Sequence, residues 1–471
     1  MRYISTRGAA PSLGFDEVLL AGLASDGGLY LPQSWPQFNA QAIKDLRTLP
    51  YAELATRIMS PFVKGSSFEK EFPDLVHSAY AAFTHPAVTP LVQLDSHLWL
   101  LELFHGPTFA FKDVALQLLG RLLDRALQTR EQRATVVGAT SGDTGSAAID
   151  ACRDKDSLDV FILYPHGRVS DVQRRQMTTV SSANIHALAI DGTFDDCQDL
   201  VKALFNDEEF RRMAHPTAVN SINWARIMAQ IVYYFAAALA LGAPDTAISF
   251  SVPTGNFGNV FAAYAARRMG LPIDQLIIGS NSNDVLPRFF EHGTLSATAV
   301  VPTLSPSMDI QISSNFERFL FDLWEQNGSA LGDAMTEFKQ SQRLSVAANA
   351  AALARDQFTA FSFDDEQTVE QIKTTHQATG ILLDPHSAIA VAAARKTKTK
   401  TPCIALATAH PAKFPAAIKQ ALGSAPALPP GLANVMTKPE RFTRLAAQLD
   451  VVRAHILSNS THPVDKKQMA I

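Results

Sequence analysis

Short apolar runs alternate with helix-length segments over most of the chain from Leu98 onward. The runs include LWLLELF, ATVVGAT, DVFILYP, NIHALAI, AISFSVP and QLIIGS, which have the composition of buried strands. The segments between them, such as SAAIDACRD and VFAAYAARRMG, have the length and pattern of helices. This alternation predicts an α/β fold with a mostly parallel sheet covered by helices.

Two regions depart from the alternation. Residues 1–90 contain helical segments, for example FDEVLLAGLA and AQAIKDLRTL, which are separated by the glycine- and proline-containing turn DGGLYLPQSWPQF. Residues 303–366 form a polar, helix-rich passage, after which ILLDPHSAIAVAAA and CIALATAHPAKF resume the earlier pattern. We therefore expect an N-terminal accessory region and an inserted helical subdomain.

Composition narrows the class of protein. The 471 residues are 47% hydrophobic and 18% charged with a net charge of -4, so neither disorder nor a basic nucleic-acid surface is indicated. The longest apolar run, IVYYFAAALALGA from Ile231, is shorter than the roughly 20 residues of a membrane span, and it predicts a buried helix. Cys152, Cys197 and Cys403 are far apart and lack CxxC spacing, which favours a reducing cytoplasm over a disulfide framework or a zinc site.

The first candidate motif is HGPTFAFKD, in which Lys112 stands between Phe111 and Asp113 where a strand-like run gives way to a helix. Burial disfavours the charged form of an amine, and a neutral amine can attack a carbonyl group. The structural alternative is a lysine that pairs with Asp113 at a helix start. The local sequence leaves both interpretations open.

Two further motifs also join a strand to a helix. In PTGNFGN, Gly255 and Gly258 permit close backbone approach, and successive amides at a helix start can bind a phosphate. In VVGATSGDTGSAA, hydroxyls and amides suit a carboxylate or phosphate, although Asp143 or Thr144 could simply cap a helix. Because ligands bind at the carboxyl ends of parallel strands, three such turns together indicate one shared crevice.

These and other segments resemble a known family. LELFHGPTFAFKD, ATSGDTG, NSINWARI, SVPTGNFGN, SMDIQISSNFER, DPHSAIAV and LATAHPAKF occur in family order over most of the chain, and YISTRG and GLYLP resemble the family's opening. The sequence resembles the long-form threonine synthases of bacteria and fungi, within the tryptophan-synthase-β-like, fold type II group of pyridoxal-phosphate enzymes. The resemblance implies two α/β lobes with the cofactor in the cleft between them. The expected ranges are 1–90 for the accessory region, 91–230 for a smaller lobe with Lys112 and the SGDTG loop, and 231–471 for a larger lobe with the GNFGN loop and the insertion.

The resemblance also implies cofactor-binding residues. Lys112 matches the catalytic lysine that binds pyridoxal 5′-phosphate covalently and later carries protons. Asp143 is the expected contact of the cofactor's 3′-oxygen, and Thr408 is the expected partner of its pyridine nitrogen. The loop that holds the cofactor phosphate is matched by Gly255, Asn256, Phe257, Gly258 and Asn259.

The substrate that the resemblance implies is O-phosphohomoserine, which brings a second phosphate. Arg168 matches a basic position of the family, while Arg174 and Arg175 have the pattern of a solvated helix face. Arg318 and Asn223 lie in family motifs, yet a surface ion pair and a helix cap explain them locally as well. The residues expected to bind substrate are Thr140, Ser141, Thr144, Arg168 and Asn223.

The resulting hypothesis is a cytoplasmic pyridoxal-phosphate lyase that converts O-phosphohomoserine and water to L-threonine and phosphate, the last step of threonine biosynthesis. We expect a monomer or homodimer with no metal, nucleic acid or membrane partner, since no histidine pair has the spacing of metal ligands. One alternative is a relative with the same cofactor, either a phospholyase that yields 2-oxobutyrate or a threonine dehydratase. Another is a non-catalytic regulator that binds a phosphate or an amino acid.

Overall fold

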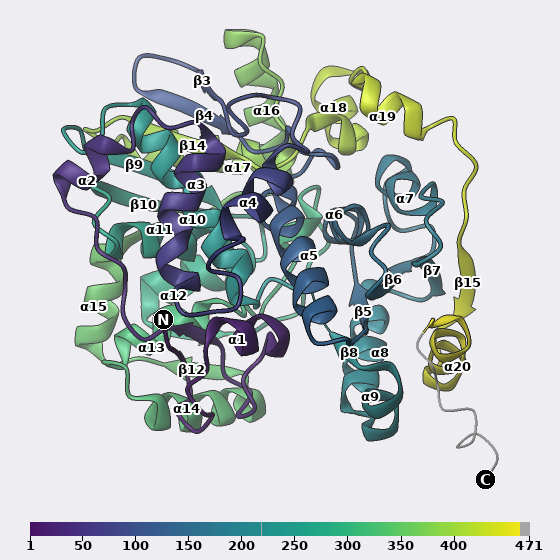
Figure 1. Ribbon diagram of the computed structural model, residues 1–471. Coiled ribbons are helices and arrows are strands. Elements are labelled where there is room, and N and C mark those ends of the chain that lie inside the picture. The colour runs from purple at the N-terminus through teal and green to yellow at the C-terminus, as the bar shows by residue number, and fades with distance from the viewer. Residues whose placement is uncertain (218, 462–471) are drawn as a thin grey trace. The chain divides into compact units, whose positions relative to one another are not determined.

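The computed structural model describes residues 1–217 and 219–461, and Figure 1 shows the order of the elements. The chain forms two compact units. Unit 1 comprises Met1–Ala115 and Ser221–Ala427, and unit 2 comprises Leu116–Asn220 with the described residues from Leu428 on. Among the residues described, none of the helices combines the length and apolar character that a membrane crossing requires.

The centre of unit 1 is a six-stranded sheet in the order β13-β10-β9-β14-β4-β3. Neighbouring strands are parallel except for β3, which is antiparallel to β4. The carboxyl ends of the other five strands therefore share one edge of the sheet. The strand bounds are β3 (Leu91–Gln93), β4 (Leu98–Glu102), β9 (Ile248–Pro253), β10 (Ile273–Ser280), β13 (Phe358–Ser362) and β14 (Cys403–Ala407).

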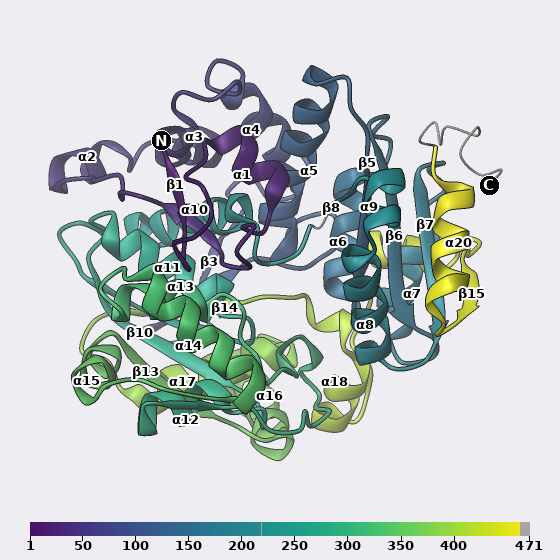
Figure 2. The ribbon, with the colours of Figure 1, turned by 90° about the horizontal axis from the view of Figure 1, so that it is seen from below.

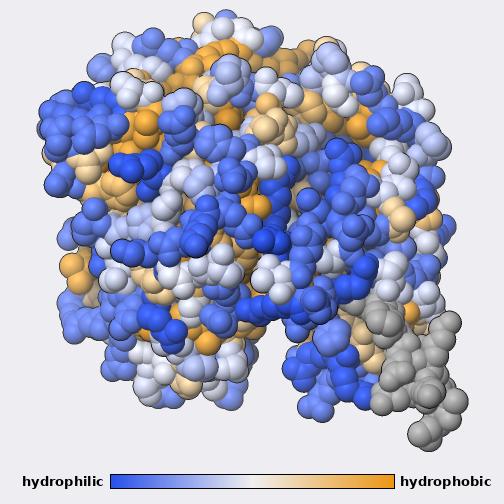
Figure 3. Space-filling view, in the orientation of Figure 1, coloured by the Kyte–Doolittle hydropathy of each residue, from blue (hydrophilic) through white to orange (hydrophobic). Residues whose placement is uncertain are grey.

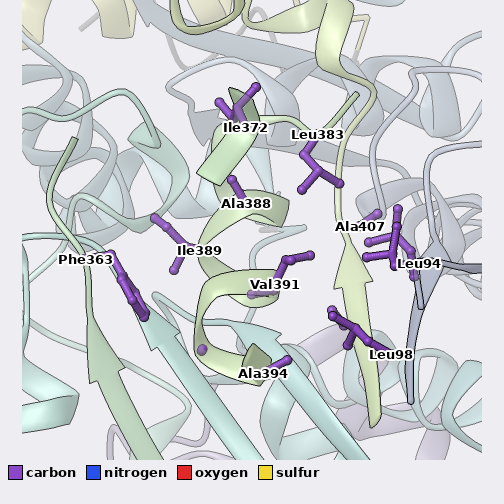
Figure 4. Packing of buried hydrophobic residues seen from close by; sticks show 14 of the residues in the cluster. Leu94, Leu98, Phe363, Ile372, Leu383, Ala388, Ile389, Val391, Ala394 and Ala407 are labelled. Atoms are coloured by element: carbon purple, nitrogen blue, oxygen red, sulfur yellow. The ribbon is translucent and has the colours of Figure 1, made fainter. Parts of the chain in front are cut away.

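Helices cover both faces of this sheet because side chains alternate along each strand. Ser251 of β9 donates a hydrogen bond to the carbonyl of Ala390 in α17 (Pro385–Thr397), while the adjacent Phe250 contacts the ring of Tyr234 in α10 (Trp224–Ala240). Figure 4 shows Ile389 of α17 among the apolar side chains that fill the core on its face of the sheet. The apolar run from Ile231 thus forms the buried helix that its sequence predicts.

The rest of unit 1 is mainly helical, with two small antiparallel sheets, β1-β2 and β11-β12. The N-terminal elements are β1 (Tyr3–Ser5), α1 (Phe15–Ala21), β2 (Tyr30–Pro32), α2 (Ala40–Asp45), α3 (Tyr51–Val63) and α4 (Phe72–Tyr80). The later elements are α11 (Gly258–Arg268), α12 (Val285–His292), β11 (Thr294–Ser296), η1 (Pro306–Met308), α13 (Phe316–Leu323), α14 (Gly328–Ser341), β12 (Arg343–Ser345), α15 (Ala348–Gln357), α16 (Asp365–Thr379), η2 (Pro411–Lys413) and α18 (Pro415–Leu422).

Unit 2 is built on a five-stranded parallel sheet in the order β15-β7-β6-β5-β8, in which β6 and β7 run side by side (Figure 2). Phe161 and Leu163 of β6 pack in one apolar cluster with α8, α9 and α20, and the alternate residue Ile162 approaches Gly145 of α6. The strands are β5 (Ala134–Ala139), β6 (Leu158–Pro165), β7 (Ile185–Asp191), β8 (Pro216–Thr217) and β15 (Thr443–Ala446). The helices are α6 (Asp143–Cys152), α7 (Asp171–Thr178), α8 (Phe194–Asn206), α9 (Glu208–Ala214), α19 (Pro430–Val435) and α20 (Leu449–Asn459), while α5 (Lys112–Thr129) runs from unit 1 into unit 2.

The α/β fold with mostly parallel sheets is confirmed, and the six strand-like runs form β4, β5, β6, β7, β9 and β10. The face seen in Figure 3 is dominated by hydrophilic residues, with smaller apolar areas.

The two compact units divide the chain differently from the ranges expected for the lobes. Lys112 belongs to unit 1, in which β4 pairs with β14, and residues 428–461 belong to unit 2, in which β15 pairs with β7. The expected helical insertion also contains β13, which pairs with β10 in the main sheet.

Candidate active site

Lys112 is the first residue of α5, and its side chain is buried, with Nζ 4.9 Å from the centroid of the Phe111 ring. The adjacent Asp113 is fully buried, and its carboxylate accepts hydrogen bonds from Thr108 N at 2.8 Å and from Thr108 Oγ1 at 2.7 Å. Asp113 therefore organises the turn that precedes the helix. Lys112 thus presents a buried amine at the start of α5, the position of the candidate nucleophile.

Thr408 lies beside Lys112 because the chain segments that follow β4 and β14 are joined by backbone hydrogen bonds. Phe111 N donates to Thr408 O at 2.8 Å, and His410 N donates to Phe109 O at 3.1 Å. Thr408 N in turn donates to Ser387 Oγ at 3.1 Å. Within the described residues the Thr408 hydroxyl makes no hydrogen bond, so it is available to a ligand next to Lys112.

The GNFGN loop connects β9 to α11, and its backbone is conformationally unusual. Phe257 has a φ of 61°, which is rare for a residue with a side chain. Its ring packs against Phe316, Phe319 and Phe358, with centroid distances of 4.9, 6.1 and 5.5 Å. This aromatic packing stabilises a backbone conformation that would otherwise be unfavourable. Such local strain is typical of ligand-binding loops.

Asn259, in the first turn of α11, presents a buried donor with no protein partner. Its Oδ1 accepts hydrogen bonds from the hydroxyls of Tyr233 and Tyr234, which fixes the orientation of the amide. Its Nδ2 is buried and has no hydrogen-bond partner among the described residues. A Cβ at Gly255 would lie 3.1 Å from both Ser307 O and Met308 Cα, which is a tight contact, so a larger residue would require the neighbouring backbone to shift. A buried donor at a helix N-terminus is suited to a phosphate.

The SGDTG loop of unit 2 is held by Thr140, the residue that directly precedes it. Thr140 Oγ1 accepts hydrogen bonds from Gly142 N at 2.9 Å and from Gly145 N at 2.8 Å. Gly142 has a φ of 140°, which favours glycine. Asp143 is buried at the start of α6, and its Oδ1 accepts a hydrogen bond from Gln173 Nε2 at 2.9 Å. The Thr140 hydroxyl therefore has a structural role as well as its candidate ligand role.

The remaining candidate residues of unit 2 differ in exposure. Ser141 and Thr144 are half-buried beside Asp143, whereas Arg168 is exposed in the segment after β6. Arg174 and Arg175 do not simply solvate a helix face. Both form ion pairs with the carboxylate of Glu440, at 2.9 and 3.4 Å.

His386 and His410, which lie in the motifs of the family resemblance, have structural surroundings. Burial lowers the pKa of His410 to about 4, and its Nδ1 accepts a hydrogen bond from Ala412 N at 3.2 Å. His386 lies between the Asp384 carboxylate and Ser307 N. No group of side chains in the described part of the chain has a metal-binding arrangement. The only amine or imidazole that we single out for catalysis is therefore that of Lys112.

Three family descriptions match this chain. The family described as Pyridoxal-phosphate dependent enzyme matches residues 82–406, Threonine synthase N terminus matches residues 2–80, and Threonine synthase, C-terminal matches residues 387–456. The chain belongs to the threonine synthase family of pyridoxal-phosphate-dependent enzymes.

Individual members of the threonine synthase family are similar to this chain over nearly its full length. A threonine synthase from Pseudomonas aeruginosa is 55% identical over 97% of this chain and 98% of its own. The crystal structure of pyridoxal-phosphate-bound threonine synthase from Brucella melitensis has a TM-score of 0.95 and 53% identity, covering 98% of this chain and 100% of that one. The crystal structure of threonine synthase from yeast has a TM-score of 0.92 and 40% identity, covering 97% and 98%.

The residues of unit 1 fit the cofactor of the threonine synthase family. A pyridoxal phosphate molecule needs a lysine amine, a set of phosphate donors and a partner for its ring nitrogen. Lys112 offers the buried amine, and Asn259 offers a buried donor that no group in residues 1–217 and 219–461 uses. Thr408 offers a hydroxyl on the segment that is hydrogen-bonded to Phe111.

Two sequence-based interpretations change in the structure. Asn223 is the N-cap of α10, where Oδ1 accepts from Ala225 N at 3.0 Å and Nδ2 donates to Leu19 O at 2.9 Å. These contacts favour the capping role over substrate binding. The interpretation of Arg318 as part of a surface ion pair is wrong, because the residue is fully buried and donates to the carbonyls of Tyr30 and Ile222.

Proposed function

We propose that this chain is a threonine synthase that converts O-phosphohomoserine and water to L-threonine and inorganic phosphate. The observation that carries the proposal is the placing of buried Lys112 beside Thr408, in the unit that also contains the GNFGN loop, where Asn259 Nδ2 has no hydrogen-bond partner among the described residues. Membership of the threonine synthase family supports the same reaction.

Lys112 carries the proton transfers in this proposal. When bound, pyridoxal phosphate supplies an electron sink that stabilises negative charge on the substrate. The amine of Lys112 removes the proton from the substrate Cα and then assists removal of a proton from Cβ, so that the γ-phosphate leaves with the electrons of its C–O bond. The substrate Cγ is then protonated, water adds at Cβ, and Cα is protonated, which yields threonine. One amine close to these carbons is sufficient, and no second base is required.

The cofactor-binding roles follow the chemistry of each position. The loop from Gly255 to Asn259 binds the cofactor phosphate through backbone amides and the Asn259 side chain, which is the donor without a protein partner. The Thr408 hydroxyl binds the pyridine nitrogen. Asp143 contacts the 3′-oxygen, and Gln173 orients its carboxylate through the hydrogen bond to Oδ1.

The substrate-binding roles fall on unit 2. Ser141 and Thr144 offer hydroxyls beside the N-terminus of α6, which is suited to the substrate carboxylate. Thr140 shapes the same loop through its bonds to two glycine amides. Arg168 offers an exposed guanidinium that can pair with the substrate phosphate through two parallel hydrogen bonds.

Product analysis tests the proposed reaction. The purified protein, supplied with pyridoxal phosphate and O-phosphohomoserine, should release threonine and phosphate in equal amounts. Release of 2-oxobutyrate with ammonia would instead identify a phospholyase or a dehydratase. A protein that bound the phosphorylated substrate without turnover would be a regulator, and the proposal would be abandoned.

We expect Arg168→Ala to raise the Michaelis constant for O-phosphohomoserine about 10-fold or more, because a charge-assisted contact to the phosphate would be lost. The turnover number and the content of cofactor should change much less. Steady-state kinetics and the cofactor absorbance would measure both effects. Arg130→Ala, which removes another exposed arginine of unit 2, is the matched control. Loss of cofactor from the Arg168 variant would show that Arg168 binds the phosphate of the cofactor and not that of the substrate.

We also propose a cytoplasmic location and a monomeric or homodimeric state. The three cysteines are free and buried, and burial raises the pKa of each thiol, to about 12, which suits a reducing compartment but not a redox role. Light scattering on the purified protein would measure the oligomeric state.

A further inference from the structure

We infer that Ser313, Asn315 and Arg318 are positioning residues, which set the backbone of the GNFGN loop for phosphate binding, and that Arg318 connects this loop to the N-terminal strand β2. The inference rests on the proposed function, in which this loop holds the cofactor phosphate. None of the three residues would touch the cofactor.

Hydrogen bonds from Ser313 and Asn315 orient the peptide groups of the GNFGN loop. Gly255 O accepts a hydrogen bond from Ser313 Oγ at 2.7 Å, and Asn256 O accepts one from Asn315 N at 3.1 Å. In a trans peptide the N–H points away from the C=O. The N–H groups of Asn256 and Phe257 therefore point away from residues 313–315. Two consecutive donors are thus directed to the opposite side of the loop, where they can bind an anion.

The side-chain amide of Asn315 is oriented by two hydrogen bonds. Its Oδ1 accepts a hydrogen bond from Arg318 Nη1, and its Nδ2 donates to Ser221 O at 3.2 Å. Asn315 is fully buried, and a Cβ at Gly258 would lie 3.3 Å from its Nδ2. The Asn315 amide therefore lies close to Gly258, and its orientation is fixed by Arg318 and Ser221 O.

The guanidinium group of Arg318 is bound to the backbone carbonyls of Tyr30 and Ile222. Nε and Nη2 donate to Tyr30 O at 3.0 and 2.8 Å, and Nη2 also donates to Ile222 O at 2.6 Å. Burial lowers the pKa of Arg318 to about 9, which is still above neutral pH, so the guanidinium stays charged. The planar fork of an arginine bridges three acceptors in fixed directions, which a lysine cannot reproduce.

The neighbouring residue of α13 strengthens the connection to the N-terminus. Glu317 accepts hydrogen bonds from Thr6 Oγ1 at 2.6 Å and from Arg7 Nε and Nη2 at 2.9 Å. Two consecutive buried side chains of α13 therefore hold β2 and the residues that directly follow β1, which lie within the segment described as Threonine synthase N terminus. This gives the N-terminal region a role in shaping the phosphate loop.

Two ligands that differ only in the phosphate group test the inference. The dissociation constants of pyridoxal phosphate and of pyridoxal would be measured by absorbance for the wild type, Arg318→Lys and Ser313→Ala. We expect both variants to bind pyridoxal phosphate about 10-fold more weakly or worse, because misdirected amides lose charge-assisted hydrogen bonds to the phosphate. The affinity for pyridoxal, which lacks that group, should change less than about 2-fold, since the inference leaves Lys112 unaffected.

Arg267→Lys is the matched control, since Arg267 also donates to backbone carbonyls in unit 1, those of Ile273 and Asp274, but not to the segment 313–318. It should leave both affinities unchanged. Equal losses for the two ligands, or unchanged binding of pyridoxal phosphate, would overturn the inference. If Arg318→Lys does not fold, Ser313→Ala alone decides between these outcomes, because Ser313 is only half-buried. A wild-type protein that bound neither ligand would overturn the proposed function itself, and the inference with it.

Discussion

Replacing Lys112 by alanine should reduce turnover of O-phosphohomoserine by at least ~10³-fold, because one amine provides both the nucleophile and the proton carrier. The residue begins α5, where alanine is a good helix former, so the fold should persist. Phosphate release would measure turnover, and circular dichroism would confirm that the variant is folded.

Lys396→Ala is a suitable control for this variant. Its Nζ lies 4.8 Å from the centroid of the Phe361 ring, which is the same kind of contact that Lys112 makes with Phe111, but the side chain is exposed at the end of α17. This control should keep wild-type turnover. If the Lys112 variant retained more than about a tenth of wild-type activity, a different residue would have to carry the proton transfers.

Chemical trapping identifies the reactive amine independently of turnover. Borohydride reduces a bond between a lysine and pyridoxal phosphate to a stable one, so peptide mapping of the treated protein should find the modification at Lys112. The Nζ of the buried Lys413 donates to Thr108 O at 2.7 Å. A modification at Lys413 would show that this lysine, and not Lys112, is the reactive amine.

The strands around the site could be predicted because buried parallel strands have a strong local signature. The apolar runs that became β4, β9 and β14 place Lys112, the GNFGN loop and Thr408 after strand ends. Local sequence does not reveal which strands are neighbours in a sheet. The pairing of β14 with β4 and the hydrogen bond from Phe111 N to Thr408 O join residues that are about 300 positions apart, and only the resemblance to a family indicated that they act together.

Short strands and buried polar residues were harder to predict. β13 and β15 have five and four residues and lie in polar or helix-rich surroundings, so their period was too short to recognise. For Arg318, the local sequence left a surface ion pair as an alternative to a role implied by the family motif. The burial of Arg318 depends on the carbonyls of Tyr30 and Ile222, which are distant in sequence. A usable signal was the spacing of Phe316 and Phe319, which places apolar residues on both sides of Arg318.

Ser387 connects the backbone of Thr408 to the buried carboxylate of Asp384 by hydrogen bonds, so the position of Thr408 depends on Asp384. Asp384 is fully buried, and its Oδ2 accepts a hydrogen bond from Ser387 Oγ at 2.5 Å, while Ser387 Oγ accepts one from Thr408 N at 3.1 Å. Asp384 is also the N-cap of α17, where its carboxylate accepts from the backbone amides of His386 and Ser387. The same side chain therefore supports a helix that covers the sheet and the residue proposed to bind the pyridine nitrogen.

Replacing Asp384 by alanine should lower the free energy of unfolding by about 2–4 kcal/mol, because a cap is lost and several buried donors are left without an acceptor. It should also weaken cofactor binding, since Ser387 would no longer be held against Thr408. Urea titration and cofactor absorbance would measure the two effects.

Asp364→Ala separates these two effects. Asp364 is the N-cap of the adjacent helix α16 and accepts from Gln367 N, but it is exposed and has no contact with Ser387 or Thr408. Loss of this cap should cost about 1 kcal/mol and leave cofactor binding unchanged. If the Asp384 variant lost no more stability than this control and kept full cofactor affinity, the buried network would not position Thr408, and the orientation of the hydroxyl would have to come from β14 alone.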